Sequence, residues 1–236
     1  MNNEILAEEY KILNENWTTN IVAAFGCPQK TTYVSPSEES IYDRLWDLAS
    51  VTKLYSLVAI LSLHEQGKFD ITKKVKDFSD AYTNISDLHI YELLNFSFEL
   101  QTSKRIDTCK SYVEAIPLLH QIKIVSKHTI YSDIGIMVVV QLLNELNGSD
   151  LFFRNYMYDL LRRINANNTL WWKDIDPNEI NIENYDLEYK YINGHLETYF
   201  TPLRTCHDPK ARVFAYTGHA GLYSSPKDVS KFASAL

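Results

Sequence analysis

Cysteine, glycine and runs of basic residues are all scarce in this sequence of 236 residues. The cysteines, Cys27, Cys109 and Cys206, lie far apart and form no Cys-x-x-Cys pair, which argues against a disulfide framework and a cysteine-ligated zinc site. The histidines show no His-x-x-x-His spacing of the kind that binds a metal on one helix face. We therefore expect no metal site and no cofactor.

The charge pattern excludes two further kinds of partner. The chain has 23 lysine and arginine residues against 30 acidic residues, and its net charge is −7. Lysine and arginine form no run long enough to bind a phosphate backbone, so we expect no nucleic acid partner. Residues 1–20 carry four glutamates and no apolar segment typical of a secretory signal. The longest apolar stretches, 54–63 and 134–146, are too short or too polar to span a bilayer. These absences predict a cytoplasmic protein without a membrane span.

The remaining composition is that of a folded domain. Hydrophobic residues make up 45% of the chain and charged residues 22%, which supplies a packed core and argues against disorder. A chain of this length suits one domain of ordinary size. We therefore predict a single domain over residues 1–236.

The first two thirds of the chain alternate between strand and helix patterns. Two short β-type runs at 20–26 and 31–35, separated by a turn, predict a hairpin. A helix that is apolar almost all round begins at Ser50 and ends near Gly67, so we expect it to be buried on most sides. Further helical or amphipathic segments are predicted at 5–16, 88–94, 112–120, 134–146 and 151–164.

The last third has weaker patterns. Residues 165–200 are rich in Asn, Asp, Glu and Tyr without clear periodicity, which predicts a long surface excursion that could face a substrate. Residues 212–216 have an extended pattern and 217–221 a turn pattern. Ser224 is placed to cap a final helix that runs to the end of the sequence.

Together these patterns predict an α+β fold in which helices pack on an antiparallel sheet and a helical insert interrupts the strands. The sheet-associated part would take residues 1–49 and 201–236. The helical part, with the long surface loop, would take residues 50–200.

The clearest candidate for chemistry is Ser50-Val51-Thr52-Lys53, at the start of the apolar helix. A spacing of three residues brings both side chains onto one helix face, within hydrogen-bonding reach. Serine becomes a strong nucleophile only when a neighbouring base takes its proton, and a lysine can do so when burial disfavours its charged form. The amide of Ser50 would also point toward a developing oxyanion. The alternative is that Ser50 caps the helix and that Lys53 extends its amine into water.

A second Ser-x-x-Lys, Ser224-Ser225-Pro226-Lys227, shows that the spacing alone is weak evidence. There a serine can cap the helix, Pro226 occupies the first turn and Lys227 faces water. Ser50 differs because a strongly apolar helix follows it, so that Lys53 begins in a desolvated environment.

Three segments in order along the chain add a family pattern. Residues 48–53 with 59–69 resemble an active-site helix, and Tyr131-Ser132-Asp133-Ile134-Gly135 resembles a Tyr-x-Asn or Tyr-x-Asp motif. Residues 207–212 with 218–224 resemble a segment of an esterase-like branch. The family is that of serine β-lactamases and penicillin-binding proteins, in particular the class C β-lactamase-like serine hydrolases. The resemblance implies a β-lactamase/transpeptidase-like fold and an acyl-enzyme on Ser50.

The same resemblance implies roles for two further residues. Tyr131 would lie beside Ser50 and Lys53 and share protons with both, while Asp133 would bind Lys53 or the amide of the substrate. Without the family pattern, Tyr131 is better explained as an aromatic residue at a helix start that packs on the core, and Asp133 as a carboxylate at a helix N-terminus.

The sequence departs from the family pattern at two places. The usual loop motif with histidine and glycine is replaced by Asn95-Phe96-Ser97-Phe98-Glu99. The family's third motif, Lys/His-Thr/Ser-Gly on a strand, has only His219-Ala220-Gly221 as a superficial counterpart, and a helical pattern follows it. We assign that segment to the earlier, non-catalytic part of the pattern, so the chain is expected to stop before the third motif.

Two hypotheses follow. The first is a serine hydrolase that forms an acyl-enzyme with a β-lactam, a D-alanyl peptide or an ester, so that the partner is a small-molecule or peptide substrate. The second is a catalytically impaired, truncated relative that acts as a binding protein or as one half of a two-chain assembly. Because open sheet edges would be exposed in a lone monomer, the second hypothesis implies a homo-oligomer or a complementing chain.

Overall fold

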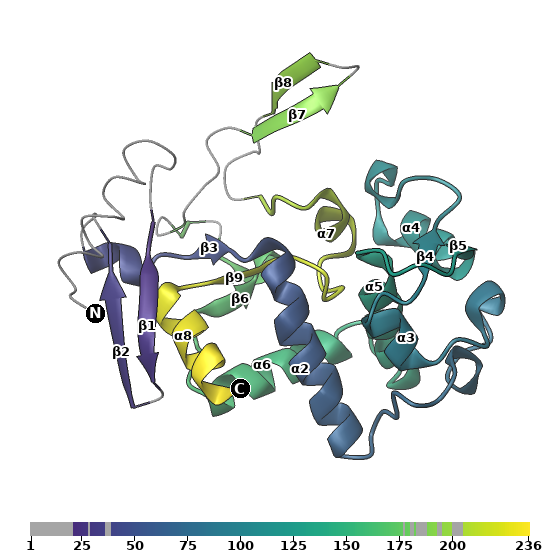
Figure 1. Ribbon diagram of the computed structural model, residues 1–236, viewed down its shortest axis with the longest axis horizontal. Coiled ribbons are helices and arrows are strands. Elements are labelled where there is room, and N and C mark those ends of the chain that lie inside the picture. The colour runs from purple at the N-terminus through teal and green to yellow at the C-terminus, as the bar shows by residue number, and fades with distance from the viewer. Residues whose placement is uncertain are drawn as a thin grey trace.

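The computed structural model of the chain describes residues 21–27, 29–35, 39–176, 178–179, 182, 188–192, 195–199 and 205–236. Its architecture is α+β, as predicted, with helices packed around short antiparallel strands (Figure 1). The predicted helix at 5–16 lies outside the described residues, as do parts of the predicted excursion at 165–200.

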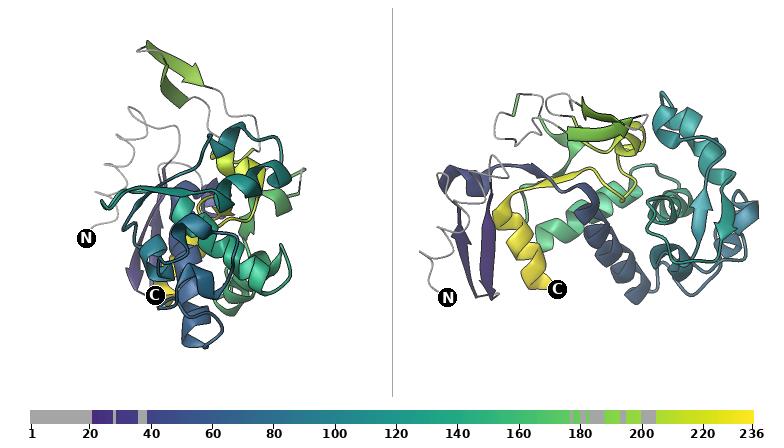
Figure 2. Two further views of the ribbon diagram at one scale, coloured as in Figure 1. Left: turned by 90° about the vertical axis from the view of Figure 1, so that its right-hand side faces the viewer. Right: turned by 45° about the horizontal axis from the view of Figure 1, so that its top comes forward.

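Helix α2 (Thr52–Glu65) is the central element of the molecule. It lies between the hairpin of β1 (Ala23–Cys27) and β2 (Lys30–Val34) with α8 (Pro226–Ala235) on one side and the helices of residues 90–146 on the other (Figure 2). Its buried residues include Tyr55, Ile60 and Leu63, each about 1% exposed or less. The ring of Tyr55 stacks on Phe232 of α8 at 3.6 Å between centroids. The sequence prediction of a helix buried on most sides is confirmed at these positions.

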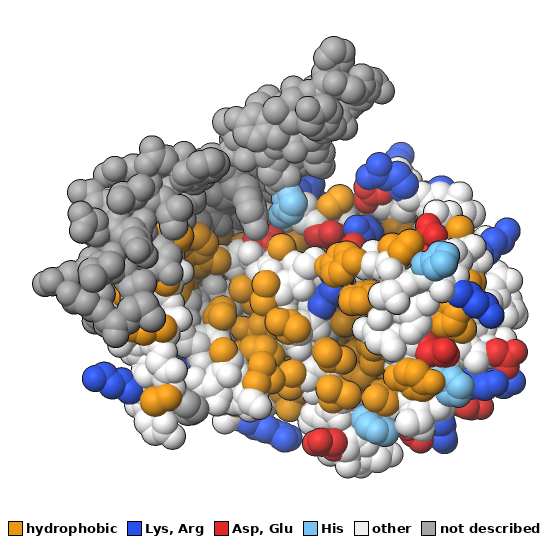
Figure 3. Space-filling view, in the orientation of Figure 1, with side chains coloured by type: hydrophobic (Ala, Val, Ile, Leu, Met, Phe, Trp, Pro, Cys, Tyr) orange, Lys and Arg blue, Asp and Glu red, His pale blue; other side chains and the backbone are white. Residues whose placement is uncertain are grey.

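One face of α2 remains apolar and exposed. Leu54 and Leu61 of α2 are open to solvent, Leu54 to 55%, as is Val51 just before the helix. Figure 3 shows hydrophobic side chains gathered over this part of the molecule.

A three-stranded sheet lies beside the N-terminal end of α2. Its order is β3 (Trp46–Asp47), β9 (Leu222–Ser224) and β6 (Thr169–Trp171), with β9 in the middle and both pairings antiparallel. In the register, Ser224 of β9 faces Trp46 on one side and Thr169 on the other. The sheet therefore joins three segments that are far apart in the sequence.

The predicted hairpin near the N-terminus is confirmed. Strands β1 (Ala23–Cys27) and β2 (Lys30–Val34) pair antiparallel, with Ala23 opposite Val34 and Cys27 opposite Lys30. A second hairpin, β7 (Glu188–Ile192) with β8 (His195–Tyr199), lies within the segment predicted as a surface excursion, as does β6.

The helical part follows α2. It contains helices α3 (Ile90–Leu94), α4 (Tyr112–His120), α5 (Ile134–Leu146) and α6 (Phe152–Arg163), with the ribbon of β4 (Glu99–Gln101) and β5 (Lys123–Ser126) between them. All residues from 135 to 144 on α5 are buried, which explains its almost continuous apolar sequence. Short 3₁₀ turns complete the path at Glu39–Asp43, Ala49–Val51, Val75–Asp77, Thr83–Ile85, Ile106–Thr108 and Trp172–Asp174.

One predicted element is wrong. Residues 212–216 were expected to be extended, but α7 (Pro209–Phe214) covers most of them. The Asp208 side chain accepts hydrogen bonds from the amides of Lys210 and Ala211, at 2.8 and 2.9 Å, and Pro209 occupies the first helical position. An N-cap followed by proline starts a helix strongly enough to override the β preference of Val213 and Phe214. The final helix is confirmed, although Ser225 rather than Ser224 caps it.

No helix within the described ranges has the length and apolar character needed to cross a membrane. The division of the chain into a sheet-associated part and a helical part at residues 50 and 200 stays a prediction.

The contact between α3 and α5 depends on Gly135. A Cβ atom at this position would lie 2.1 Å from the carbonyl oxygen of Leu93, closer than any real Cβ contact. Gly135 is the second residue of α5, so this close approach sets where that helix begins relative to α3.

Gly135→Ala is expected to lower the free energy of unfolding by about 2–3 kcal/mol, because the backbone of Leu93 must move away. Chemical denaturation monitored by circular dichroism measures the change. Gly148→Asn is the matched control: a Cβ there meets no atom within 4 Å, and asparagine tolerates the positive φ of 62°. Equal stability of the two variants would contradict the close-packing explanation.

Candidate active site

Ser50 lies at the junction between β3 and α2, in the 3₁₀ turn Ala49–Val51. Its side chain is exposed, so its oxygen is accessible. Ala49 before it adopts a positive φ of 44°, a conformation that costs a non-glycine residue energy and must be held by its surroundings. Asp47 provides such a restraint, because Oδ1 accepts the amide of Ala49 at 2.8 Å and Oδ2 accepts the amide of His207 at 2.9 Å.

Lys53 is buried, with 8% of its surface exposed. Its Nζ donates to Ser50 Oγ at 3.0 Å and to the carbonyl oxygen of His219 at 3.0 Å. The same Nζ lies 2.7 Å from Asp133 Oδ1. The geometry therefore differs from the alternative in which Lys53 extends its amine into water. Three acceptors from three segments instead hold it against the Ser50 oxygen.

Asp133 is the residue before α5, but its side chain makes no capping hydrogen bond to that helix. The carboxylate instead binds two lysines, Lys53 through Oδ1 and Lys210 through Oδ2, the latter at 2.8 Å. Burial alone would raise the pKa of Asp133, but the neighbouring imidazole and the two ammonium groups bring it below its ordinary value. The carboxylate is therefore ionised at neutral pH.

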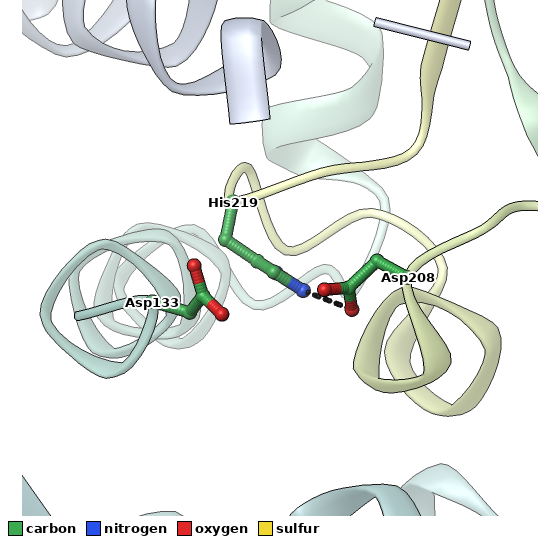
Figure 4. Close-up of side chains that lie close together, drawn as sticks. All are labelled: Asp133, Asp208 and His219. Atoms are coloured by element: carbon green, nitrogen blue, oxygen red, sulfur yellow. Dashed lines mark hydrogen bonds and ion pairs between the residues drawn. The ribbon is translucent and has the colours of Figure 1, made fainter. Parts of the chain in front are cut away.

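The charged network continues from Lys210 on α7 to Asp208 and His219. Lys210 Nζ lies 3.4 Å from Asp208 Oδ2, and His219 Nε2 lies 2.9 Å from Asp208 Oδ1. Figure 4 shows the imidazole of His219 between the two carboxylates and directed at Asp208. Burial would raise the pKa of Asp208, but hydrogen bonding and charge from His219, followed by Lys210, hold it well below its usual range. Burial would lower the pKa of Lys210, but Asp133 and Asp208 raise it.

Asp133, Asp208 and His219 bring one ligand atom each within 4.8 Å of one another, a spacing that could hold a metal ion. However, Lys53 and Lys210 already bind the Asp133 oxygens, and Lys210 also contacts Asp208. A cation placed among these residues would face two ammonium groups. The donor set is therefore charge-compensated and does not fit a metal.

Tyr131 is 60% exposed and presents the face of its ring to the site. The Lys53 Nζ lies 4.9 Å from the centroid of this ring, a cation–π contact. The ring of Phe96 packs on that of Tyr131, with 5.2 Å between the two centroids. The φ of Phe96, 59°, is also positive. Phe96 belongs to the segment 95–99 that departs from the family pattern, so that departure lies directly beside Tyr131.

Residues 217–222 cross the N-terminal half of α2 and hold it. Ser56 Oγ donates to the carbonyl oxygen of Gly218 at 2.8 Å, and the amide of Leu222 donates to Thr52 Oγ1 at 3.3 Å. Gly218 is required by this approach, because a Cβ would lie 2.8 Å from Val140 and 2.9 Å from Ser56 Oγ, and its φ is 75°. The side chain of His219 is fixed by Thr217 Oγ1 at 2.7 Å from Nδ1.

The structure thus brings Ser50, Lys53 and Asp133 together and places the ring of Tyr131 over the Lys53 amine. The sequence prediction omitted Asp208, Lys210 and the imidazole of His219 from the site. The Asp-Pro pair at 208–209, which is typical of a helix start, together with the lysine that follows it, could have indicated Asp208 and Lys210. The segment 219–221 continues into β9 and then α8, so both a short strand and the predicted helix follow it.

The model of the Beta-lactamase family matches residues 19–236 of this chain. No curated protein sequence matches this chain. Among solved structures, FmtA from Staphylococcus aureus is similar with a TM-score of 0.74 and 17% identity, over 99% of this chain and 65% of that protein.

Two further solved structures are similar to the chain. A class C beta lactamase from Rhodobacter sphaeroides has a TM-score of 0.69 and 16% identity, over 98% of this chain and 64% of its own. A D-amino acid amidase from Ochrobactrum anthropi has a TM-score of 0.74 and 14% identity, over 98% of this chain and 68% of its own. At these identities the likeness shows the fold, and this chain spans about two thirds of the length of each neighbour.

Asp208→Asn is expected to lower the free energy of unfolding at pH 7 by about 1.5–3 kcal/mol, because charged hydrogen bonds to His219 and Lys210 are lost. The pKa of Asp208 is depressed in the folded state, so its contribution is complete above the unfolded value of about 3.9 and is lost as the pH falls toward the folded value. The difference between wild type and variant should therefore narrow below about pH 4. Denaturation curves from pH 7 to pH 2 measure it.

Asp87→Asn is the control for this experiment, since Asp87 also has a lowered pKa beside Lys76 and Lys74 but is fully exposed. Its stability should stay near that of wild type, because water screens exposed ion pairs. A constant difference between wild type and Asp208→Asn at every pH would contradict the ionised state assigned to Asp208.

Proposed function

This chain belongs to the beta-lactamase family, and from that premise we propose that it is a serine hydrolase that forms an acyl-enzyme on Ser50. The observation that carries the proposal is the position of the buried Lys53 amine, 3.0 Å from the exposed Ser50 oxygen. This distance is within the reach that a general base needs to remove a proton from a nucleophile.

In the proposed reaction, Ser50 Oγ attacks the carbonyl carbon of the substrate while its proton passes to Lys53. The Ser50 amide, in the first turn before α2, supplies one hydrogen bond to the developing oxyanion. Collapse of the tetrahedral intermediate leaves the acyl group on Ser50 and breaks the bond to the leaving group, which takes up the proton from Lys53 by way of Tyr131. Water then attacks the ester and gives a proton to Lys53. The second collapse returns this proton to Ser50 Oγ and releases the carboxylic acid. Asp133 holds the Lys53 amine in place through this cycle.

Tyr131 is proposed to exchange protons with the leaving group. Its ring already contacts the Lys53 amine, and its exposed side chain can reach the approaching substrate. A phenol can donate a proton to a leaving group and, once ionised, accept one from a nucleophile.

The proposed substrate is a β-lactam, a D-alanyl peptide or an ester. Structural neighbours named as a class C beta lactamase and a D-amino acid amidase support a small acyl substrate for a site of this fold. The alternative is a binding protein without turnover, alone or completed by another chain. The observation in its favour is the contact of Phe96, from the altered segment 95–99, with Tyr131.

Replacement of the nucleophile provides the first test. Wild-type protein incubated with a fluorescent penicillin, and separately with a fluorophosphonate, should gain one covalent adduct in intact mass spectra. Ser50→Ala should gain none, because the nucleophilic oxygen is gone.

Ser224→Ala is the matched control, since Ser224 is the serine of the second Ser-x-x-Lys and is buried against Thr169, with 2.7 Å between the two hydroxyl oxygens. This variant should label like wild type when folded. A folded wild-type sample that forms no adduct with either reagent would favour the binding protein.

Replacement of the two proton-transfer candidates separates their roles. Lys53→Met should slow acylation by about 100-fold or more, because Ser50 loses its base. Tyr131→Phe should slow acylation by β-lactam by about 100-fold, while keeping the ring contact with Lys53. Stopped-flow fluorescence measures both rates. An unchanged rate in Tyr131→Phe would show that Tyr131 acts only through its ring.

A further inference from the structure

We propose that Lys210 is a positioning residue of the acylation site, which binds the second oxygen of Asp133 and thereby weakens the hold of that carboxylate on the Lys53 proton. The inference rests on the proposed function in one respect: it takes Lys53 as the base for Ser50. Lys210 would join the site from α7, a segment that carries none of the three motif residues Ser50, Lys53 and Tyr131.

The geometry divides Asp133 between two lysines. Oδ1 lies 2.7 Å from Lys53 Nζ and Oδ2 lies 2.8 Å from Lys210 Nζ, so each oxygen has its own ammonium partner. The side chain of Lys210 is 26% exposed, and that of Asp133 is 18% exposed, so water screens this interaction only in part. Asp208 starts α7 by capping it, and this start places Lys210 two residues later against α5.

The division matters because Lys53 must lose a proton before it can take one from Ser50. A single carboxylate 2.7 Å from the amine favours the ammonium form of that lysine. A second ammonium group on the same carboxylate offsets this effect by its own attraction for Asp133 and its repulsion of Lys53. With Lys210 present, the two lysines and the two aspartates of the network balance in charge. Without it, Lys53 is the one lysine of the network that faces the two carboxylates.

A substitution at Lys210 removes none of the other charged and titratable groups of the site. They come from each described element that surrounds the amine. Ser50 on the segment of Lys53 and Tyr131 and Asp133 before α5 contact the amine directly, and His219 binds it through its carbonyl oxygen. Farther out, Asp208 before α7 binds the imidazole of His219, and Asp47 on β3 binds the amide of Ala49.

Lys210 could instead serve only to tie α7 to α5. A purely structural tie would affect stability but would leave the protonation of Lys53 unchanged. Two substitutions distinguish these roles. Lys210→Gln removes the charge but keeps a hydrogen-bond donor for Asp133, and Lys210→Arg keeps both the charge and the donors.

The test follows the Lys53 side chain directly. Full-length protein is labelled with carbon-13 at the lysine ε positions, and the Lys53 resonance is assigned by its loss in Lys53→Arg. The pH midpoint of this resonance is then measured in wild type, Lys210→Gln, Lys210→Met and Lys210→Arg. Lys104→Met is the matched control, because it removes one positive charge from an exposed ion pair with Glu114. Circular dichroism selects the variants that fold.

In Lys210→Gln and Lys210→Met, the Lys53 midpoint should rise by roughly 1–2 pH units, because the ammonium form gains from the uncompensated Asp133. Lys210→Arg and Lys104→Met should keep the wild-type midpoint. An unchanged midpoint in folded Lys210→Gln would overturn the inference, as would an equal rise in Lys104→Met.

A second measurement connects this result to the reaction. The acid limb of the pH–rate profile for Ser50 acylation should move upward by the same interval in Lys210→Gln, about tenfold in rate for each pH unit. The two ideas fail separately. Wild type that is not acylated would overturn the proposed function, while the resonance midpoints would still decide the role of Lys210.

Discussion

The buried ammonium group of Lys53 is the constraint on which the rest of the structure depends. A lysine amine removed from water must be surrounded by acceptors, because an uncompensated buried charge is among the most costly features a fold can contain. Here the acceptors come from three places: the Ser50 hydroxyl, the Asp133 carboxylate and the backbone carbonyl of His219. The start of α2, the start of α5 and the loop at 217–221 must therefore meet at one point, and the close approaches at Gly135 and Gly218 let them do so.

The same requirement explains why the site contains an extended network instead of one ion pair. Asp133 is itself buried in part, and Lys210 binds its second oxygen. Lys210 in turn contacts Asp208, which binds His219, and Thr217 completes the chain on the far side of the imidazole. Charges alternate along this network, so each charged group has an opposite neighbour. The spacing of the two carboxylates and the imidazole resembles a metal site, but the lysines occupy the positions that a cation would need.

Much of the fold was predictable where the determinants are local. The hairpin at 23–34, the apolar helices α2 and α5 and the final helix follow from periodicity, turn residues and caps that lie within a few residues of each other. The failure at 212–216 is also local in origin: the Asp-Pro start of α7 outweighed the β-branched and aromatic residues that suggested a strand. Strand β6 could not be found in this way, because a run of three residues becomes a strand only when β9 pairs with it.

The order of residues is enough to predict the helix that begins beside Ser50, the spacing that brings Lys53 toward the serine oxygen, and the family pattern that singles out Tyr131 and Asp133. These depend on residues close together in the chain or on short motifs. The groups that surround the Lys53 amine, in contrast, are known from the packing of the folded chain. Asp133, Lys210 and His219 are far from Lys53 in the sequence, and their contacts arise from how α2, α5 and α7 pack around a common core. No local pattern encodes such a contact, because the free energy that forms it comes from burying the whole network at once.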